Sequence, residues 1–339
     1  MRVAVVGATG AVGREMLRIL EERDFPVDEL FPLASARSEG KKVPFRDWQM
    51  PVQELTHGRL ADVELALLSA GAAVSRAFVP DAAAAGVTCI DNSSAFRMEP
   101  DVPLSIPEVN PEALEGAPKI VSVPNCTVIT AMMAIGPLHH AAGLRSLVLS
   151  SYQSVSGAGW RAVRELIEQI DKLHGMEEDL GRPDMDAMPV GDVAGKTIAF
   201  NVLAKIADFG EGGYTGEELK IMAEPGKILG VPDLEVAATA VRVPVLVGHS
   251  VSLVARFSRP IAPDEAREVL SSAAGVTVMD DPGNGIYPSP LESAGRDDTL
   301  VGRVRQGPDE STLLLFSCAD NLRKGAALDA VQIAEHLFT

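Results

Sequence analysis

The sequence is poor in aromatic residues and in cysteine. Phe, Trp and Tyr make up 4% of the 339 residues, and the three cysteines (Cys89, Cys126 and Cys318) are widely spaced. An odd number of scattered cysteines argues against a disulfide framework and favours a reducing, cytoplasmic environment. No CxxC or HExxH pattern occurs, so we predict no metal site.

Excess positive charge and long apolar runs are missing too. The formal net charge is -17, from 30 basic and 47 acidic residues, and no basic run stands out. This balance argues against a nucleic-acid partner, and an anionic substrate would need local Arg and Lys to overcome the overall field. No apolar run approaches the length of a membrane span, and no targeting signal precedes the apolar stretch that begins at Arg2.

What is present is a change of pattern along the chain. Up to residue 125, short apolar strand-like segments alternate with helix-like ones, which predicts parallel βαβ units in a Rossmann-type α/β domain. Beyond it, the strand-like segments are longer and alternate with period two. That pattern predicts an α+β domain at 126–320 with a largely antiparallel sheet and helices on one face. A good helix pattern closes the chain within 321–339.

A glycine-rich turn lies between the first predicted strand and the first predicted helix. It reads "GATGAVG", with Gly7, Gly10 and Gly13 in GxxGxxG rather than GxGxxG spacing. Glycines let the backbone turn tightly and approach a pyrophosphate, which the N–H groups at the helix N-terminus bind. A turn without a ligand is the alternative, and the strand–turn–helix context argues against it.

The end of the second predicted strand indicates which dinucleotide would bind. An NAD-binding domain places Asp or Glu there to hold the ribose hydroxyls. Here the strand leads into Ser35, Arg37 and Ser38, and no acidic residue occurs before Glu39. Two hydroxyls and a guanidinium suit a 2′-phosphate, so this loop favours NADP over NAD. The alternative is a solvated loop that happens to contain one arginine.

Cys126 stands where an apolar strand-like run, "KIVSV", gives way to a helix-like run. Asn125 is the expected N-cap, and a thiol at a helix N-terminus feels the positive end of the helix dipole, which favours the thiolate. The alternative is a small core residue, the role expected of Cys89 and Cys318. A thiolate beside a nicotinamide site predicts aldehyde–acyl chemistry through a thioester.

That chemistry needs a general acid/base, and His249 is the best candidate among the six histidines. It follows a predicted strand that carries Arg242, and the neighbouring Gly248 permits close approach. His139 and His140 instead fall near a predicted helix end, where we expect them to act as cationic caps.

Motifs along nearly the whole chain resemble those of the aspartate-semialdehyde dehydrogenase family. In chain order they are "GATGAVG", "LASARSEG", "DNSSAFR", "IPEVN", "PNC", "SYQSVSGAG", "YTGEELK", "RVPVLVGHS" and "DNLRKGAALDAVQIAE". Several motifs in one order are far more specific than any one alone.

The resemblance implies an NADP-dependent phosphorylating aldehyde dehydrogenase. Its reaction would be the reduction of L-4-aspartyl phosphate to L-aspartate 4-semialdehyde, in the biosynthesis of lysine, diaminopimelate, methionine, threonine and isoleucine. The resemblance also implies a cytoplasmic homodimer. Residues 1–125 would be the NADP-binding domain, completed by a C-terminal helix at 321–339, and 126–320 would be the catalytic and dimerisation domain.

Catalytic and cofactor-binding roles follow from the same resemblance. Cys126 would be the nucleophile, His249 the general acid/base, and Gln153 would position the bound intermediate. In a strand, Gln153 could equally just satisfy backbone groups. The implied cofactor contacts are Gly7, Thr9, Gly10, Ala11, Val12, Gly13, Ser35, Arg37, Ser38, Ser156, Gly157 and Asn321.

The resemblance also implies the residues that bind the substrate. Arg242 would pair with the α-carboxylate and Glu217 with the α-ammonium group, while Arg97 and Lys220 would bind phosphate. Glu217 and Lys220 are i, i+3 on a predicted helix, so an ordinary intrahelical ion pair is the alternative. For Arg97, the alternative is a surface arginine after a turn.

Two other functions compete with this one. A sister enzyme would reduce N-acetylglutamyl phosphate, but an acetylated amine offers no ammonium group to Glu217. A non-catalytic NADP-binding homologue would have no reason to keep Cys126, Gln153, Arg242 and His249 together.

Overall fold

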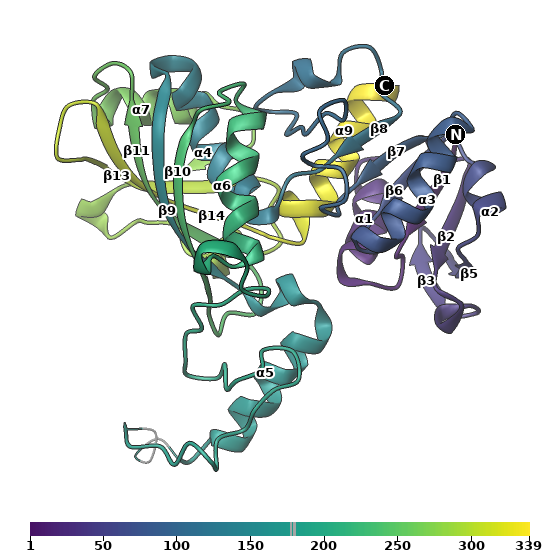
Figure 1. Ribbon diagram of the computed structural model, residues 1–339, viewed down its shortest axis with the longest axis horizontal. Helices are drawn as coiled ribbons and strands as arrows, with labels where there is room; N and C mark the ends of the chain where they lie inside the picture. Colours follow the sequence, from purple (N-terminus) through teal and green to yellow (C-terminus); the bar gives the residue numbers. More distant parts are fainter. Residues whose placement is uncertain (177, 179–180) are drawn as a thin grey trace.

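The computed structural model describes residues 1–176, 178 and 181–339. Figure 1 shows two sheet-containing parts side by side, and an arm carrying α5 that extends away from them. The N-terminal part holds a parallel sheet, and the second part holds a mixed sheet. The predicted α/β class with two sheet-based layers is confirmed.

The N-terminal sheet has the strand order β5-β2-β1-β6-β7-β8, and all neighbouring pairs in it are parallel. Its strands are β1 (Arg2–Val6), β2 (Glu29–Ala34), β5 (Gln53–Glu54), β6 (Leu65–Leu68), β7 (Thr88–Asp91) and β8 (Ile120–Ser122). The helices between them are α1 (Ala11–Glu22), α2 (His57–Ala61) and α3 (Ala72–Ala84). Every residue of β6 and β7 is buried, as expected where helices cover both faces of a parallel sheet. The predicted βαβ units are confirmed.

The first strand lies at the point where the strand order reverses. β1 pairs with β2 on one side and with β6 on the other, with Val6 opposite both Leu33 and Leu68. Ligands of open parallel sheets bind beyond the carboxyl ends of the strands at such a switch point. The glycine turn after β1 and the Ser35–Ser38 loop after β2 therefore meet at one edge.

The second sheet has the strand order β10-β9-β11-β14-β13-β12. Its strands are β9 (Leu144–Gln153), β10 (Glu235–Arg242), β11 (His249–Phe257), β12 (Val276–Val278), β13 (Thr299–Gln306) and β14 (Thr312–Ala319). The central pairs are antiparallel, as predicted, whereas β9–β10 and β12–β13 are parallel. Each parallel pair is joined by a long connection that contains a helix, which is what a parallel pairing requires.

Helices pack against this sheet and form much of the core. They are α4 (Cys126–Ala142), α6 (Gly216–Ile228), α7 (Pro263–Ser271) and the short α8 (Pro290–Ser293). α4 is apolar and buried along most of its length, and it contacts β9, β11, β13 and β14. α6 packs on β10 and α4, so its side chains reach the start of α4.

The end of the chain returns to the N-terminal part. A π-helical turn (Arg323–Ala327) and α9 (Leu328–Phe338) both contact α1, and α9 lies beside the N-terminal sheet in Figure 1. Arg323 forms ion pairs with Glu15 at 3.0 Å and Glu22 at 2.7 Å. The domain boundaries at 1–125 with 321–339, and at 126–320, stay a prediction.

Two smaller features were not predicted. A hairpin of β3 (Lys42–Phe45) and β4 (Trp48–Pro51) follows the Ser35–Ser38 loop. The arm consists of α5 (Trp160–Leu173) packed on the segment around 187–203, with Val163, Leu166 and Ile198 in a small core of its own. No helix among residues 1–176, 178 and 181–339 is long and apolar enough to cross a membrane.

Candidate active site

The glycine turn after β1 has no room for side chains at two of its positions. Gly7 has φ +87°, and a Cβ added to it would lie 2.4 Å from the Ser69 carbonyl oxygen. A Cβ on Gly13 would lie 2.3 Å from the carbonyl oxygen of Gly7. These glycines therefore set the close approach of strand, turn and helix that the sequence pattern predicts.

We expect Gly7→Ala to destabilise the protein by roughly 2–5 kcal/mol, because it adds a steric clash to an unfavourable positive φ. Urea unfolding would measure the change. Gly58→Ala is the matched control in the same domain, since no atom lies within 4 Å of its added Cβ. Equal stability of the two variants would contradict this account of the turn.

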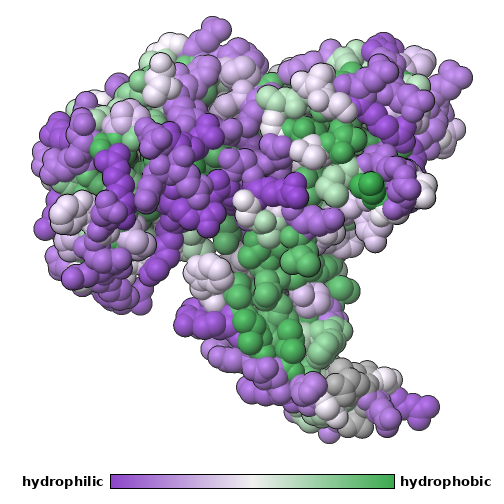
Figure 2. All heavy atoms as spheres, turned by 180° about the vertical axis from the view of Figure 1, so that it is seen from behind, coloured by the Kyte–Doolittle hydropathy of each residue, from purple (hydrophilic) through white to green (hydrophobic). Residues whose placement is uncertain are grey.

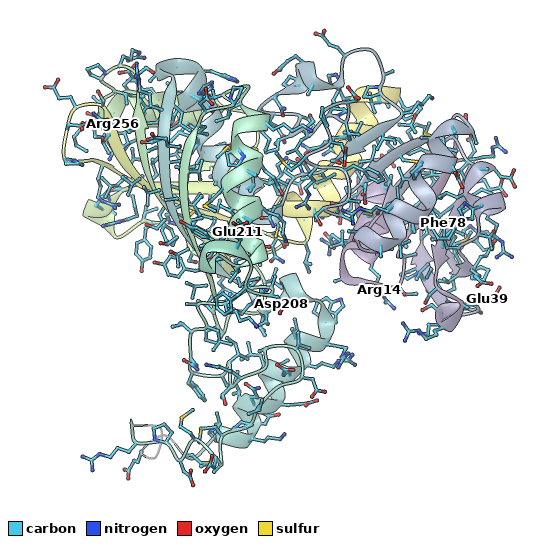
Figure 3. The ribbon with its side chains drawn as sticks, viewed as in Figure 1. Arg14, Glu39, Phe78, Asp208, Glu211 and Arg256 are labelled. Carbon is cyan, nitrogen blue, oxygen red and sulfur yellow. The ribbon has the colours of Figure 1, made fainter. Side chains whose placement is uncertain are left out.

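Two cavities lie beside this turn. The first, of about 540 Å³, is lined by the predicted residues Gly7, Thr9, Gly10, Ser35, Arg37 and Ser38. Phe78 of α3, labelled in Figure 3, lines it as well. The second, of about 270 Å³, is lined by the predicted residues Gly10, Ala11, Val12, Arg97, Cys126, Ser156, Gly157 and Asn321.

The two cavities share the lining residues Gly10 and Ser69, so they lie next to each other. The prediction places the adenosine end of a dinucleotide near Arg37 and its nicotinamide end near Cys126, and these two residues line the two neighbouring cavities. Residues far apart in the sequence thus come together here.

Cys126 begins α4, as predicted. The side-chain oxygen of Asn125 accepts hydrogen bonds from the N–H groups of Thr127 at 2.9 Å and Val128 at 3.3 Å, so Asn125 is the N-cap. A Cβ on Gly325, in the π-helical turn, would lie 3.1 Å from the Cβ of Cys126. Cys126 therefore lies at the start of α4, next to the π-helical turn that contains Gly325.

The charge state of Cys126 differs from the expectation based on the helix alone. Burial raises the pKa of the Cys126 thiol to about 11, and the charge of Glu217 adds to the rise. The cations Arg97, Arg242 and Lys220 act in the opposite direction. In the ligand-free chain Cys126 is thus a thiol at neutral pH. Burial of the thiol therefore outweighs the helix dipole that favours the thiolate.

The ends of three neighbouring strands bring further predicted residues together. Arg242 lies opposite Gln153 in the β10–β9 register, and Ser250 lies opposite Tyr152 in the β11–β9 register. His249, one residue before Ser250, therefore lies at the same edge as Gln153 and Arg242. Sequence patterns predicted these strands, but not that their ends meet here.

His249 is fully buried, and burial lowers its pKa to about 3, with the charge of Arg242 as the next cause. The backbone N–H of Ser154 donates to Nδ1 of His249 at 3.2 Å. The neutral ring therefore carries its proton on Nε2, which has no hydrogen-bond partner among the described residues. His249 is thus a neutral group with an uncommitted Nε2.

Gly157 connects His249 to the cavity of Cys126. It lines that cavity, and a Cβ added to it would lie 3.2 Å from Cε1 of His249 and 3.2 Å from Nη1 of Arg242. Gly157 is therefore adjacent both to the cavity and to the imidazole of His249. Cys126, His249 and Arg242, the candidates for nucleophile, acid/base and carboxylate binding, therefore lie around Gly157, and their roles stay a prediction.

Glu217 of α6 sits at the centre of a polar cluster. Its carboxylate accepts hydrogen bonds from Asn125 at 2.9 Å, Gln153 at 3.2 Å and Lys220 at 2.8 Å. Burial raises the pKa of Glu217, but the Lys220 ammonium and these hydrogen bonds outweigh it and lower the pKa to about 2. The i, i+3 ion pair between Glu217 and Lys220 is present. With this lowered pKa, Glu217 is ionised at neutral pH and places a negative charge next to Asn125.

Arg97 is buried, with 7% of its surface exposed, so a surface arginine is the wrong description. It donates to the Val123 and Asn92 carbonyl oxygens at 2.9 and 2.8 Å, and to Glu224 at 2.9 Å. A guanidinium has five N–H groups, so two remain for a ligand in the cavity that Arg97 lines.

Several residues that organise the site were not predicted. The Ser154 hydroxyl donates to Oδ1 of Asn321 at 2.9 Å, and the same oxygen accepts from Gly248 N–H at 2.9 Å. Glu224 holds Arg97. Its position seven residues after Glu217 on a predicted helix is a signal that could have found it, because that spacing puts both on one face.

His139 differs from its expected role as a cation. Its Nδ1 accepts a hydrogen bond from the Leu144 N–H at 3.0 Å, and burial and His140 lower its pKa. The neutral ring of His139 therefore accepts a hydrogen bond from the residue that follows α4 and its C-cap. The predicted role as a cationic cap is wrong for this residue.

Comparisons with known proteins agree with the geometry. The family model "Semialdehyde dehydrogenase, NAD binding domain" matches residues 2–117, and "Semialdehyde dehydrogenase, dimerisation domain" matches residues 135–324. The aspartate-semialdehyde dehydrogenase of Aquifex aeolicus is 46% identical over 99% of this chain and 97% of its own length. That of Bacillus subtilis is 44% identical, with the same coverage.

Solved structures are similar as well. Aspartate semialdehyde dehydrogenase II from Vibrio cholerae superposes with a TM-score of 0.92 at 41% identity, covering 99% of this chain and 98% of that one. The same enzyme complexed with ASA gives a TM-score of 0.91 at 40% identity, covering 99% and 97%. With its dinucleotide-type turn, its helix-terminal cysteine and these full-length matches, the chain belongs to the aspartate-semialdehyde dehydrogenase family.

Proposed function

We propose that the chain reduces L-4-aspartyl phosphate to L-aspartate 4-semialdehyde with NADPH, through a thioester on Cys126. One observation carries the proposal most directly. Cys126 shares a cavity with the cofactor-type turn at Gly10–Val12 and with Arg97, and the opposite charges of Glu217 and Arg242 both act on its thiol. A nucleophile, a dinucleotide turn and binders for three substrate charges occur together.

The charged groups of the substrate have matching partners. Arg242 would bind the α-carboxylate, since its guanidinium is held by the Ser154 carbonyl oxygen at 2.7 Å beside Gly157. Glu217 would bind the α-ammonium group in place of part of its contact with Lys220. Lys220 and the two remaining N–H groups of Arg97 would then bind the phosphate. The negative charge of Glu217 would also disfavour an N-acetylated substrate, because the carboxylate would then face an uncharged amide.

The catalytic residues divide the work in a simple sequence. The Cys126 sulfur bonds to the acyl carbon while the thiol proton passes to the departing phosphate; the bond from that carbon to the phosphate oxygen breaks, and phosphate leaves. When bound, the nicotinamide supplies the hydride that reduces the resulting thioester. The Nε2–H of His249 would donate to the oxygen that gains negative charge. As the carbon–sulfur bond breaks, the electron pair on that oxygen re-forms the aldehyde carbonyl, and a proton relayed from solvent through His249 restores the Cys126 thiol.

The loop after β2 supports NADP as the form of the cofactor. Ser35, Arg37 and Ser38 line the first cavity, where the adenosine ribose would lie. The Ser38 hydroxyl is 3.5 Å from the Thr9 hydroxyl, so both can face a phosphate placed there. A guanidinium between hydroxyls suits a 2′-phosphate better than a bare ribose.

We expect Arg37→Ala to weaken NADP binding about 10-fold or more and NAD binding less than 2-fold, because it removes a charge-assisted contact to the 2′-phosphate only. Equilibrium titration of each cofactor by fluorescence measures both constants. Arg18→Ala is the control, since Arg18 pairs with Glu15 and Glu22 on α1. Equal losses for NADP and NAD in Arg37→Ala would reject the assignment.

A homodimer is the proposed assembly, and the match to a dimerisation domain supports it. The side of the mixed sheet away from α4 exposes Val148, Tyr152 and Val254. Figure 2 shows further apolar surface along the arm, where Ile167 and Ile170 of α5 are partly exposed. A second copy covering these side chains would remove apolar surface that a monomer leaves in water.

The activity can be tested in the direction of aldehyde oxidation. Purified protein with aspartate semialdehyde and NADP should reduce the cofactor, at a rate that rises and saturates with added phosphate. N-acetylglutamate semialdehyde should be a much poorer substrate. Equal or better turnover of the acetylated aldehyde would favour the sister enzyme, and no turnover of either would reject both.

A further inference from the structure

α6 carries two buried carboxylates that the mechanism above does not use, Glu218 and Glu224. Glu224 is 1% exposed and lies seven residues, about two helical turns, after Glu217, so Glu217 and Glu224 share one face of the helix. Burying a carboxylate is costly unless its oxygens are well paired. Its partners therefore indicate what it does.

Both oxygens of Glu224 are used by residues that line the Cys126 cavity. Oε1 accepts from Nη1 of Arg97 at 2.9 Å, and Oε2 accepts from the backbone N–H of Asn125 at 2.6 Å. Arg97 and Asn125 both line the cavity, and Asn125 directly precedes Cys126. The carboxylate of Glu224 thus connects Arg97, the candidate phosphate-binding residue, to Asn125 at the start of the helix that carries Cys126.

The same helix also holds the backbone that carries Arg97. The ammonium group of Lys227 donates to three carbonyl oxygens, those of Arg97 at 2.8 Å, Glu99 at 2.6 Å and Val102 at 2.7 Å. Lys227 therefore fixes the turn at 97–102, while Glu224 fixes the guanidinium. An arginine held at both ends keeps its remaining N–H groups in one direction.

Asn125 is held from two sides by α6. Its side-chain N–H donates to Glu217 at 2.9 Å, and its backbone N–H donates to Glu224. Since the same Asn125 caps α4, its position decides where Cys126 points. The helix that supplies the ammonium and phosphate binders therefore also orients the nucleophile.

We propose that Glu224 is a positioning residue that aligns Arg97 with the phosphate and, through Asn125, aligns Cys126 with the acyl carbon. The inference rests on the proposed function, because it takes the ligand of Arg97 to be phosphate. Glu224 acts through its two partners and has no bond to the substrate.

Glu224→Gln tests this role sharply. A glutamine has one acceptor oxygen, so its amide N–H₂ would face either Arg97 or Asn125, which are both donors. In the oxidation direction the KM for phosphate should rise about 10- to 100-fold, the size expected for losing a charge-assisted hydrogen bond. The KM for aspartate semialdehyde should change less than about 3-fold, and kcat should fall because Cys126 is misaligned.

Glu218→Gln is the matched control. Glu218 is a neighbouring buried glutamate of α6, but it accepts from the Thr215 N–H at 2.7 Å and the Ala240 N–H at 3.0 Å, which belong to the scaffold. Its variant should lower thermal stability and leave the KM for phosphate unchanged. If Glu224→Gln does not fold, Glu224→Asp replaces it, because the shorter side chain keeps the charge but cannot reach both partners.

A double-mutant cycle with Arg97→Ala separates the role of Glu224 from a general loss of structure. In the Arg97→Ala background, Glu224→Gln should add less than about 2-fold to the KM for phosphate. Additive effects, or a Glu224→Gln variant that behaves like Glu218→Gln, would overturn the proposal. A wild-type protein without phosphate-dependent activity would instead reject the proposed function.

Discussion

Cys126→Ala should lower kcat by roughly 10⁴-fold or more while cofactor affinity stays within about 2-fold of the wild type. The substitution removes only the sulfur and keeps the Cβ that meets Gly325. No other thiol can replace it, because Cys89 and Cys318 are fully buried within strands β7 and β14. The turn around Gly10, which we propose binds the cofactor, is unchanged by the substitution.

Two measurements on one preparation check this expectation. Steady-state reduction of NADP with aspartate semialdehyde gives kcat, and fluorescence titration gives cofactor affinity. Cys318→Ala is the control, since it removes a thiol that hydrogen-bonds to Ser250 inside the sheet and should leave kcat nearly unchanged. Retained turnover in Cys126→Ala would reject Cys126 as the nucleophile.

His249→Gln should lower kcat about 10²- to 10⁴-fold, the usual contribution of a positioned acid/base group. Glutamine fills similar space and can accept from the Ser154 N–H, but it cannot relay the proton that restores the Cys126 thiol. Steady-state rates measure the effect. His139→Gln is the control, because His139 meets only the chain at the end of α4. Losses of the same size in both variants would contradict the assignment.

The buried imidazole also predicts a pH dependence of stability. The folded-state pKa of His249 is lowered to about 3, whereas an exposed histidine titrates near 6.5. Between these values the unfolded chain binds the extra proton, so this group's contribution to stability falls as pH falls from 6.5 toward 3. From pH 7 to pH 5, the free energy of unfolding of the wild type should fall by about 2 kcal/mol more than that of His249→Gln. Denaturant unfolding of both proteins at the two pH values measures this difference. Equal losses would show that His249 is not buried as a neutral ring.

Most of the fold follows from patterns that the sequence displays. Short apolar runs flanked by turns gave the parallel strands, because burial on both faces needs continuous apolar residues. The short β5 and the β3–β4 hairpin escaped prediction, since "QE" is too short to show a pattern, and "KVPF" and "WQMP" each contain a proline, which argues against a strand. The parallel pairing of β10 was missed because alternation along a strand does not reveal its neighbour's direction, and the three-residue strand β12 was not predicted at all.

The site was predictable where chemistry is local and less so where it depends on packing. The start of α4 at Cys126 could be read from Asn125, because a side-chain cap is encoded next to the helix it begins. The raised pKa of Cys126 could not, since burial is a property of the whole fold. The meeting of Gln153, Arg242 and His249 depends on strand register, which joins segments about 90 residues apart.

A single-turnover experiment without phosphate tests the central claim most directly. Enzyme mixed with aspartate semialdehyde and NADP should form about one equivalent of reduced cofactor per chain in a burst and then slow, because the thioester on Cys126 awaits phosphate. Mass spectrometry of the quenched protein should find the aspartyl group on the peptide that carries Cys126, and adding phosphate should release it. Continuous turnover without phosphate, or a burst with the label on another residue, would contradict the account.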